Sequence, residues 1–407
     1  MAKKQSIKYI VLALFFVITV ISAVLLGSVK INYNISDYLD ESTETKISLN
    51  ILEDEFGMTG NIQVMVENVS VDTAYEISNI IKDIDNVLLV NFDSTDSGYY
   101  KDGNALFAVI VNGDEYSETA KTVLDNIKEE LDELFEGRTN YGGAVVEKLN
   151  MRNTLKSEIV LILAIAVIFA IGIMLIMAKS WIEPLVLLGA SGIAVLINLG
   201  TNAFFDDVSY ITNAVAAILQ LALSVDYSIV LLHEYRNQKR SISNSEDAML
   251  AAIKQSFNPI FASALTTVMG LVALFFMTMK IGFDIGIVLT KGILISAITA
   301  MTLLPALLIL LEKLMAKTSK HDLSISGKGL CDFAVKRGKP VLAFVLVLII
   351  LGGVLQFNNT YTFTDSANPN QEIIDTFGAN NTVVVVYPNE RLNWADEAEL
   401  ATKLSEF

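Results

Sequence analysis

The chain has 407 residues, of which 53% are hydrophobic and only 18% are charged, and its mean hydropathy is +0.50. These values exclude an ordinary soluble protein and predict a membrane protein. The formal net charge of −16 disfavours nucleic acid or an anionic lipid surface as the main partner, because both would repel the chain. A single cysteine, Cys331, excludes an internal disulfide framework and a thiolate metal cluster.

Seven long apolar runs predict seven membrane-spanning helices. A nearly uncharged run of about 18 residues or more is long enough, because about 20 helical residues cross a hydrocarbon core of about 30 Å. The first run is longer than the apolar part of a signal peptide, about 7 to 15 residues, so we predict an uncleaved anchor. The runs cover residues 9–29, 159–178, 182–200, 211–232, 259–279, 285–311 and 340–355.

The distribution of charge predicts the orientation of these helices. Basic residues are concentrated before the first run, after the fourth run and before the seventh, and such loops remain in the cytoplasm. Residues 30–156 instead hold 25 acidic against 10 basic residues, which places nearly all of the net negative charge in one segment. We therefore predict a cytoplasmic N-terminus and a large domain outside the cell.

The exterior segment between the first two runs has the pattern of a small α+β domain. Alternating apolar residues predict strands at 61–67, 87–93, 106–112 and 139–141, and helical spacing predicts helices at 72–83 and 115–135. The resulting order, β-α-β-β-α-β, is that of the ferredoxin-like arrangement. The segment has no histidine or cysteine and its carboxylates are dispersed, so an acidic solvated surface is favoured over a metal or glycan site.

Asp226 is the strongest functional candidate because it lies inside the fourth apolar run. A carboxylate at that depth costs several kcal/mol unless it is neutralised, paired or hydrated, so we expect it to be turned into the helix bundle. A group of this kind can take up and release protons, and the hydroxyl of Tyr227 can donate to it or pass a proton along a water chain. The alternative is a structural carboxylate that a neighbouring helix satisfies.

Three hydroxyl residues of the fifth run reach a similar depth to Asp226. These are Ser263, Thr266 and Thr267. The fifth run enters the membrane from the side at which the fourth run ends, so these residues lie at about the depth of Asp226. They are candidate partners of the proton relay, or residues that only hold helices together.

Lys291 is the one charged residue of the sixth run, and its role stays open. It lies nearer the outer face than Asp226, so a direct pair with Asp226 is not expected. Asp284, seven residues earlier on the same face, and a group in the missing half are candidates for its partner, and its stem can also reach the interface. The segment 233–236 is expected to be a solvated helix end.

The order of segments repeats after the seventh run. The Phe-Gly pairs at 56–57 and 377–378 lie 321 residues apart, and the strand and helix predicted at 61–67 and 72–83 have counterparts at 382–387 and 393–404. A repeat of this length is typical of transporters built from duplicated modules. The expected organisation is an anchor helix (1–30), an exterior domain (31–156), a five-helix bundle (157–312), a basic cytoplasmic linker (313–339), a seventh helix (340–357) and a second exterior domain that is cut short (358–407).

This organisation resembles the resistance-nodulation-division (RND) superfamily, and within it the MMPL family of Gram-positive type. The similar segments are Leu-Ser-Val-Asp-Tyr-Ser at 223–228, Leu-Leu-Pro-Ala-Leu at 303–307, and the exterior words at 32–39 and 55–57. The resemblance implies a multi-pass protein of the bacterial plasma membrane that exports lipids or hydrophobic compounds in exchange for protons. It implies that Asp226 and Tyr227 form one relay pair, and that a second pair lies in a missing C-terminal half or a second subunit. A homo-oligomer also stays open.

Two other functions share parts of this pattern. The five-helix group resembles sterol-sensing bundles, which bind or sense lipids, and the whole arrangement resembles the Sec-associated proton-driven secretion factor, whose motif in the fourth helix differs. An enzyme is the class that the sequence favours least, because it has no P-loop, nucleophile elbow or metal-ligand cluster. No cofactor is predicted.

Overall fold

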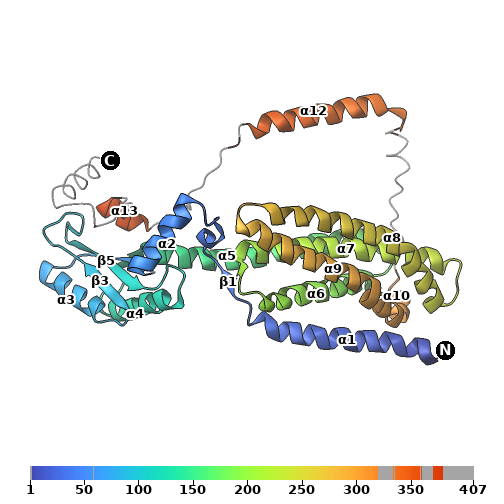
Figure 1. Ribbon diagram of the computed structural model, residues 1–407, viewed down its shortest axis with the longest axis horizontal. Coiled ribbons are helices and arrows are strands. Elements are labelled where there is room, and N and C mark those ends of the chain that lie inside the picture. Colours follow the sequence, from blue (N-terminus) through green and yellow to red (C-terminus); the bar gives the residue numbers. More distant parts are fainter. Residues whose placement is uncertain are drawn as a thin grey trace. The chain divides into compact units, whose positions relative to one another are not determined.

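The computed structural model describes residues 2–57, 59–319, 333, 335–357, 359 and 370–378 (Figure 1). Two compact units are formed, one by residues 1–40 with 154–365 and the other by residues 41–153 with 366–407. The first unit contains the membrane helices, and the second contains the sheet. Residues 31–40 were expected in the exterior domain but group with the helices, because a short strand among them pairs with the bundle.

Within the described residues, seven helices are long and apolar enough to cross a membrane, which confirms the polytopic fold expected from the sequence. Two of them extend well beyond their apolar runs: α5 begins at Ala144 and α8 at Ser245. The seven are α1 (Ala2–Leu26), α5 (Ala144–Met177), α6 (Glu183–Gly200), α7 (Tyr210–Lys239), α8 (Ser245–Val272), α9 (Lys280–Leu310) and α12 (Gly338–Gln356).

Helices α6, α7, α8 and α9 pack against one another, and α1 packs on α6 and α9. The approach of α1 to α6 requires a glycine, because a Cβ atom on Gly200 would lie 2.2 Å from the carbonyl oxygen of Ser22. Glycine at such a crossing is a common way for membrane helices to reach close contact. The position of α1 is therefore set by the absence of a side chain on α6.

Short elements connect the helices of this unit. Strand β1 (Ile31–Asn32) follows α1 and pairs in parallel with β7 (Val208–Ser209), which leads into α7. Beside this pair the rings of Tyr33 and Tyr210 stack with their centres 5.6 Å apart. The chain leaving α1 is thus bound to the start of α7. The other short elements are η1 (Ile35–Tyr38), η2 (Thr201–Phe204), η3 (Ala273–Phe276) and α10 (Glu312–Lys317).

The second unit contains a ferredoxin-like sheet with the predicted order of elements. Its strands are arranged β3-β5-β2-β6, all antiparallel neighbours, and β4 adds to the edge of β5. The elements are β2 (Thr59–Val66), α3 (Val71–Lys82), β3 (Val87–Asn91), β4 (Tyr100–Lys101), β5 (Asn104–Asn112), α4 (Glu118–Leu134) and β6 (Thr139–Gly142).

Strand alternation places the core of this domain on one face of the sheet. Ile62, Val64 and Val66 of β2 are fully buried with Phe107 of β5, and helices α3 and α4 cover them (Figure 1). Successive strand residues point to opposite faces, so a period of two is enough to specify which face the helices cover. This period is visible in the sequence, and it explains why the domain could be predicted.

The start of the second repeat lies on the other face of the same sheet. Helix α13 (Gln371–Phe377) buries Ile373 against Met65 and Leu106, and Asn370 Nδ2 donates to the Tyr141 carbonyl over 3.2 Å. Its counterpart in the first repeat is α2 (Glu44–Phe56). Both helices end in a glycine with a left-handed backbone, with φ of 76° at Gly57 and 89° at Gly378. The strand predicted at 382–387, the helix at 393–404 and most of the basic linker at 313–339 lie outside the described residues.

Candidate functional site

Two neighbouring faces of helix α7 differ in burial. Gln220, Ser224 and Tyr227 follow at helical spacing and are buried inside the bundle. Asp226 lies one residue from this stripe, about 100° round the helix, and is exposed. The expectation that Asp226 turns into this bundle is therefore wrong for the part of the chain that the structure describes, because the buried stripe uses a neighbouring face.

Asp226 has no hydrogen-bond or ion-pair partner among the described residues, and large apolar side chains share its face. Leu219 is 45% exposed and Val230 is 42% exposed on the same stripe of α7. A carboxylate in hydrocarbon must be covered, hydrated or protonated. The face of α7 around Asp226 therefore combines one carboxylate with large, exposed apolar side chains.

Tyr227 points from α7 towards α8. Its hydroxyl is buried and makes no hydrogen bond of ordinary geometry with the described residues, although Ser263 and Thr267 lie close enough to interact with it. The hydroxyl of Thr267 donates to the Ser263 carbonyl oxygen over 3.0 Å, and that of Thr266 to the Ala262 carbonyl oxygen over 2.8 Å. Two of the three predicted partners therefore surround Tyr227, and Thr266 is exposed and bonded within its own helix.

Lys291 of α9 binds the C-terminal end of α6. Its Nζ donates to the Asn198 carbonyl oxygen over 3.1 Å and to Asn202 Oδ1 over 2.6 Å. The ammonium also lies 4.9 Å from the centre of the Phe205 ring. A positive charge is favourable beside the last carbonyls of a helix. Neither Asp226 nor Asp284 is its partner in the described part of the chain.

Gln220 forms the centre of a buried polar layer that joins three helices. Its Nε2 approaches the carbonyl oxygens of Ala194 and Gly292 and the hydroxyl of Ser296, at 3.0 to 3.2 Å. Asn198 Nδ2 donates to its Oε1 over 2.8 Å. A Cβ atom on Gly292 would lie 2.6 Å from that amide nitrogen, so the layer requires glycine there. Gln220 is recognisable in the sequence as a polar residue within an apolar run, but the sequence does not identify which residues of α6 and α9 are its hydrogen-bond partners.

A second polar cluster lies at the end of α7 where the chain enters from β7. Asp284 accepts from the Ser209 amide over 2.9 Å and from the Thr212 hydroxyl over 2.6 Å. Nearby, the Tyr38 hydroxyl donates to Asp207 Oδ1 over 3.1 Å. Burial and the surrounding carboxylates raise the pKa of Tyr38 well above its usual range. This cluster fixes the segment after α1 to α7 and α9.

At the opposite end of the bundle, Arg236 pairs with a buried carboxylate of α6. Glu183 accepts from the guanidinium of Arg236 and from the amides of Lys179 and Ser180. His233 is exposed as expected, but Tyr235 and Arg236 pack inward. The sequence predicted only a solvated helix end, because an arginine at a helix terminus gives no sign of a partner 53 residues away.

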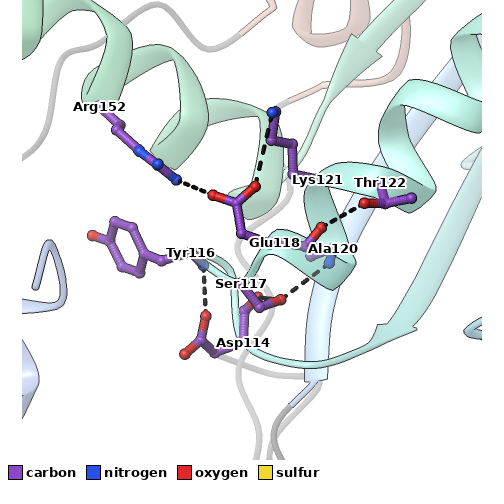
Figure 2. A network of polar contacts seen from close by, with 8 residues as sticks. All are labelled: Asp114, Tyr116, Ser117, Glu118, Ala120, Lys121, Thr122 and Arg152. Atoms are coloured by element: carbon purple, nitrogen blue, oxygen red, sulfur yellow. Dashed lines mark hydrogen bonds and ion pairs between the residues drawn. The ribbon is translucent and has the colours of Figure 1, made fainter. Parts of the chain in front are cut away.

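The α+β domain contains surface polar contacts and no metal-ligating group of three or more side chains within the described residues. Figure 2 shows a network of polar contacts at the start of α4, where Arg152 of α5 donates to Glu118 over 3.0 Å. Ser117 caps α4 by accepting from the Ala120 amide over 3.0 Å. These contacts are those of a helix start, which supports a structural role for this surface.

The model of the MMPL family matches residues 61–327, which is more than half of the chain. Membrane protein SCO0839 of Streptomyces coelicolor is 26% identical over 217 residues, which cover 52% of this chain and 31% of that protein. The hopanoid transporter HpnN of Rhodopseudomonas palustris is 27% identical over 197 residues, covering 46% of this chain and 22% of HpnN. The matches thus span a third or less of these relatives.

Among solved structures, the translocon-associated membrane protein SecDF of Thermus thermophilus is similar to this chain. The identity is 16% and the TM-score is 0.42, with 77% of this chain and 39% of that chain covered. A second SecDF structure, in its super-membrane-facing form, has a TM-score of 0.38. These values are too low to bear on function.

Proposed function

Because the chain belongs to the MMPL family, we propose that it serves the proton-driven export of lipids or other hydrophobic and amphiphilic compounds across a bacterial plasma membrane. In this proposal Asp226 carries the proton and Tyr227 assists its transfer. The name of HpnN, a hopanoid transporter, supports a lipid as the substrate class. The basic segments around the helices support a cytoplasmic N-terminus and an exterior α+β domain.

The observation that carries the proposal is the position of Asp226. It is a carboxylate within a helix that is long and apolar enough to span a membrane, it has no partner among the described residues, and Tyr227 is the next residue in the chain. Intramembrane ionisable residues that no neighbour neutralises are typical of proton pathways. A purely structural carboxylate would instead accept hydrogen bonds, as Asp284 does.

The exposed face around Asp226 also supports a partner. Leu219, Val230 and Asp226 would be covered by a second helical bundle, supplied by the same gene product, another polypeptide or a second copy. Protonation of Asp226 would then change the contact between the two bundles. One charge crossing a potential of 100 mV provides about 2.3 kcal/mol, which is enough to shift a two-state equilibrium by a factor of tens.

The test is efflux from proteoliposomes that contain the protein expressed from its complete gene. An imposed pH gradient should drive lipid or dye efflux with proton uptake, and the Asp226→Asn change should abolish both. The Asp226→Glu change, which keeps a titratable group, should retain part of the activity. Val230→Asn is the matched control, because it places the same amide on the same face one turn away and should leave gradient-dependent efflux in place.

Other outcomes favour the other functions. Lipid binding that is unchanged in Asp226→Asn, without any gradient-driven efflux in the unmodified protein, would favour a lipid-sensing module. Gradient-dependent stimulation of protein secretion, without movement of lipid, would favour a secretion factor. Either result would overturn the exporter proposal.

A further inference from the structure

A cavity in the membrane unit lies between α1, α8 and α9, and the residues of the proton site do not line it. Its volume is about 280 Å³. Its walls include Val11 of α1, Ile253 of α8 and Met301 of α9, and Lys8 and Glu246 also line it. Leu250 of α8 is 52% exposed and also lines it, so the cavity opens on the outside of the bundle. We call it the α1–α8–α9 pocket.

The pocket lies at one end of the helices, and that end can be identified. Lys8 precedes the apolar part of α1, Glu246 lies in the first turn of α8, and Ile309 is one residue from the end of α9. The same end carries the basic residues that the sequence assigns to the cytoplasm. The pocket is therefore at the level of the cytoplasmic leaflet and its headgroups.

The pocket explains why the segment 303–307 contains small and cyclic residues. Pro305 and Ala306 line the cavity, whereas Leu303 and Leu304 are buried away from it in the bundle. A larger side chain at residue 306 would occupy the space. Walls of this kind favour an apolar chain, because a polar group would lose its hydration there without gaining a partner.

The charges at the mouth restrict the headgroup. Lys8 Nζ lies 3.5 Å from Glu246 Oε1, and the two side chains are 19% and 29% exposed. An amphiphile with only a negative headgroup would meet Glu246, and one with only a positive headgroup would meet Lys8. A headgroup with both charges can satisfy both residues, with its phosphate at Lys8 and its ammonium at Glu246. The Lys8–Glu246 ion pair is partly exposed and therefore weak enough for these contacts to replace it.

We infer that the α1–α8–α9 pocket binds one acyl chain of a zwitterionic phospholipid of the phosphoethanolamine type, taken from the cytoplasmic leaflet. The lipid's phosphate pairs with Lys8 and its ammonium with Glu246 while the chain lies between Ile253, Met301 and Pro305. The pocket would also be the site at which lipid is loaded for export, and this part of the inference rests on the proposed function. Binding of the lipid in the pocket does not depend on that function.

The experiment uses phosphatidylethanolamine with a photoreactive acyl chain in vesicles that contain the protein, without any pH gradient. After illumination, labelled peptides are identified by mass spectrometry. Label is expected on the α8 and α9 segments around Met249 and Met301. Thr302→Phe and Ala306→Phe, which fill the pocket, should reduce this label at least about fivefold, because the added ring excludes the chain.

Matched variants and lipids separate this site from ordinary lipid contact. Leu294→Phe adds the same ring to an exposed position of α9 outside the pocket and should leave the label unchanged. Thr302 is exposed, so its variant should fold even if the variant of the buried Ala306 does not. Phosphatidylglycerol with the same reactive chain should label less, and Glu246→Gln should remove this preference.

The inference fails if filling the pocket does not reduce the label, or if both lipids label equally in the unmodified protein. Asp226→Asn keeps these results apart from the export proposal, because it should abolish efflux while the label around Met301 persists. Loss of label with intact efflux in Thr302→Phe would remove the loading role and leave a lipid-binding site.

Discussion

The α+β domain and the membrane bundle distribute polar residues in opposite ways. In the described part of the α+β domain, the buried side chains are apolar, as at Ile62, Ile77 and Phe107. In the bundle, Asn198 and Gln220 are fully buried while many large apolar side chains are exposed. The difference follows from the solvent, because water satisfies polar groups at the surface of the α+β domain and hydrocarbon cannot do so for the membrane bundle.

Asp226 differs from the other polar residues when the two regions are compared. In the α+β domain an exposed carboxylate is ordinary, since water hydrates it. In the bundle the largest polar side chains are turned inward, and those of the layer around Gln220 are hydrogen-bonded. Asp226 departs from that rule on an apolar face, and such departures from local consistency are expected at functional positions.

The largest effect is expected from the core of the α+β domain. Phe107→Ala removes a fully buried ring and should lower the free energy of unfolding of this domain by about 3–5 kcal/mol. Leu89→Ala, at a residue that is 49% exposed, is the control and should change it little. Amide hydrogen exchange of β2 and β5 in the intact protein measures the difference. Equal effects of the two variants would mean that burial does not hold the domain together.

An intermediate effect is expected from the polar layer of the bundle. Gln220→Leu leaves the partners on α6 and α9 unsatisfied in hydrocarbon and should cost about 1–3 kcal/mol in a detergent unfolding titration. Gln238→Leu is matched, because Gln238 bonds Glu234 at the end of α7, where water can replace the lost contact. If both changes had the same small effect, the layer would not stabilise the bundle.

The smallest effect concerns Glu115 of the α+β domain. Burial raises its pKa from the ordinary 4.5, with Asp114 and Glu147 adding to the rise and Lys148 opposing it. The native state then binds more protons than the unfolded state in the window just above pH 4.5, so stability falls as the pH rises through that window.

Glu115→Gln removes this loss, so the variant should be more stable than the unmodified protein at pH 7, by under about 1 kcal/mol, and equally stable at pH 4. Thermal unfolding at both pH values measures the effect, with the exposed Glu133→Gln as the control. A variant that is less stable at pH 7 would show that the carboxylate makes a favourable contact in its charged form.

The residues around Asp226 show how far sequence reasoning extends. Asp226 and Tyr227 stand out because a charge inside an apolar run is rare, and Ser263 and Thr267 follow from depth alone. Depth does not specify the direction of a side chain, however, and a shift of one residue on a helix is a rotation of about 100°. Asp226 was therefore expected inside the bundle but is exposed, whereas Tyr227, the next residue, is buried.

Lys291 and Arg236 show the same limit. Both were visible as charges at or within a helix, and their partners, the carbonyl of Asn198 and the carboxylate of Glu183, were not. A carbonyl oxygen is present in every residue, so composition cannot mark the one that accepts. Only the packing of α6 against α7 and α9 brings these atoms together.

The sequence by itself determined the seven helices and the β-α-β-β-α-β domain, because both depend on periods and lengths that a chain carries locally. It also identified Asp226 as a carboxylate inside an apolar run. Tertiary structure decided which face of α7 is buried, that α13 covers the sheet behind Met65, and that a pocket remains beside Pro305. These features depend on contacts between segments far apart in the chain, and short-range patterns do not encode which surfaces meet.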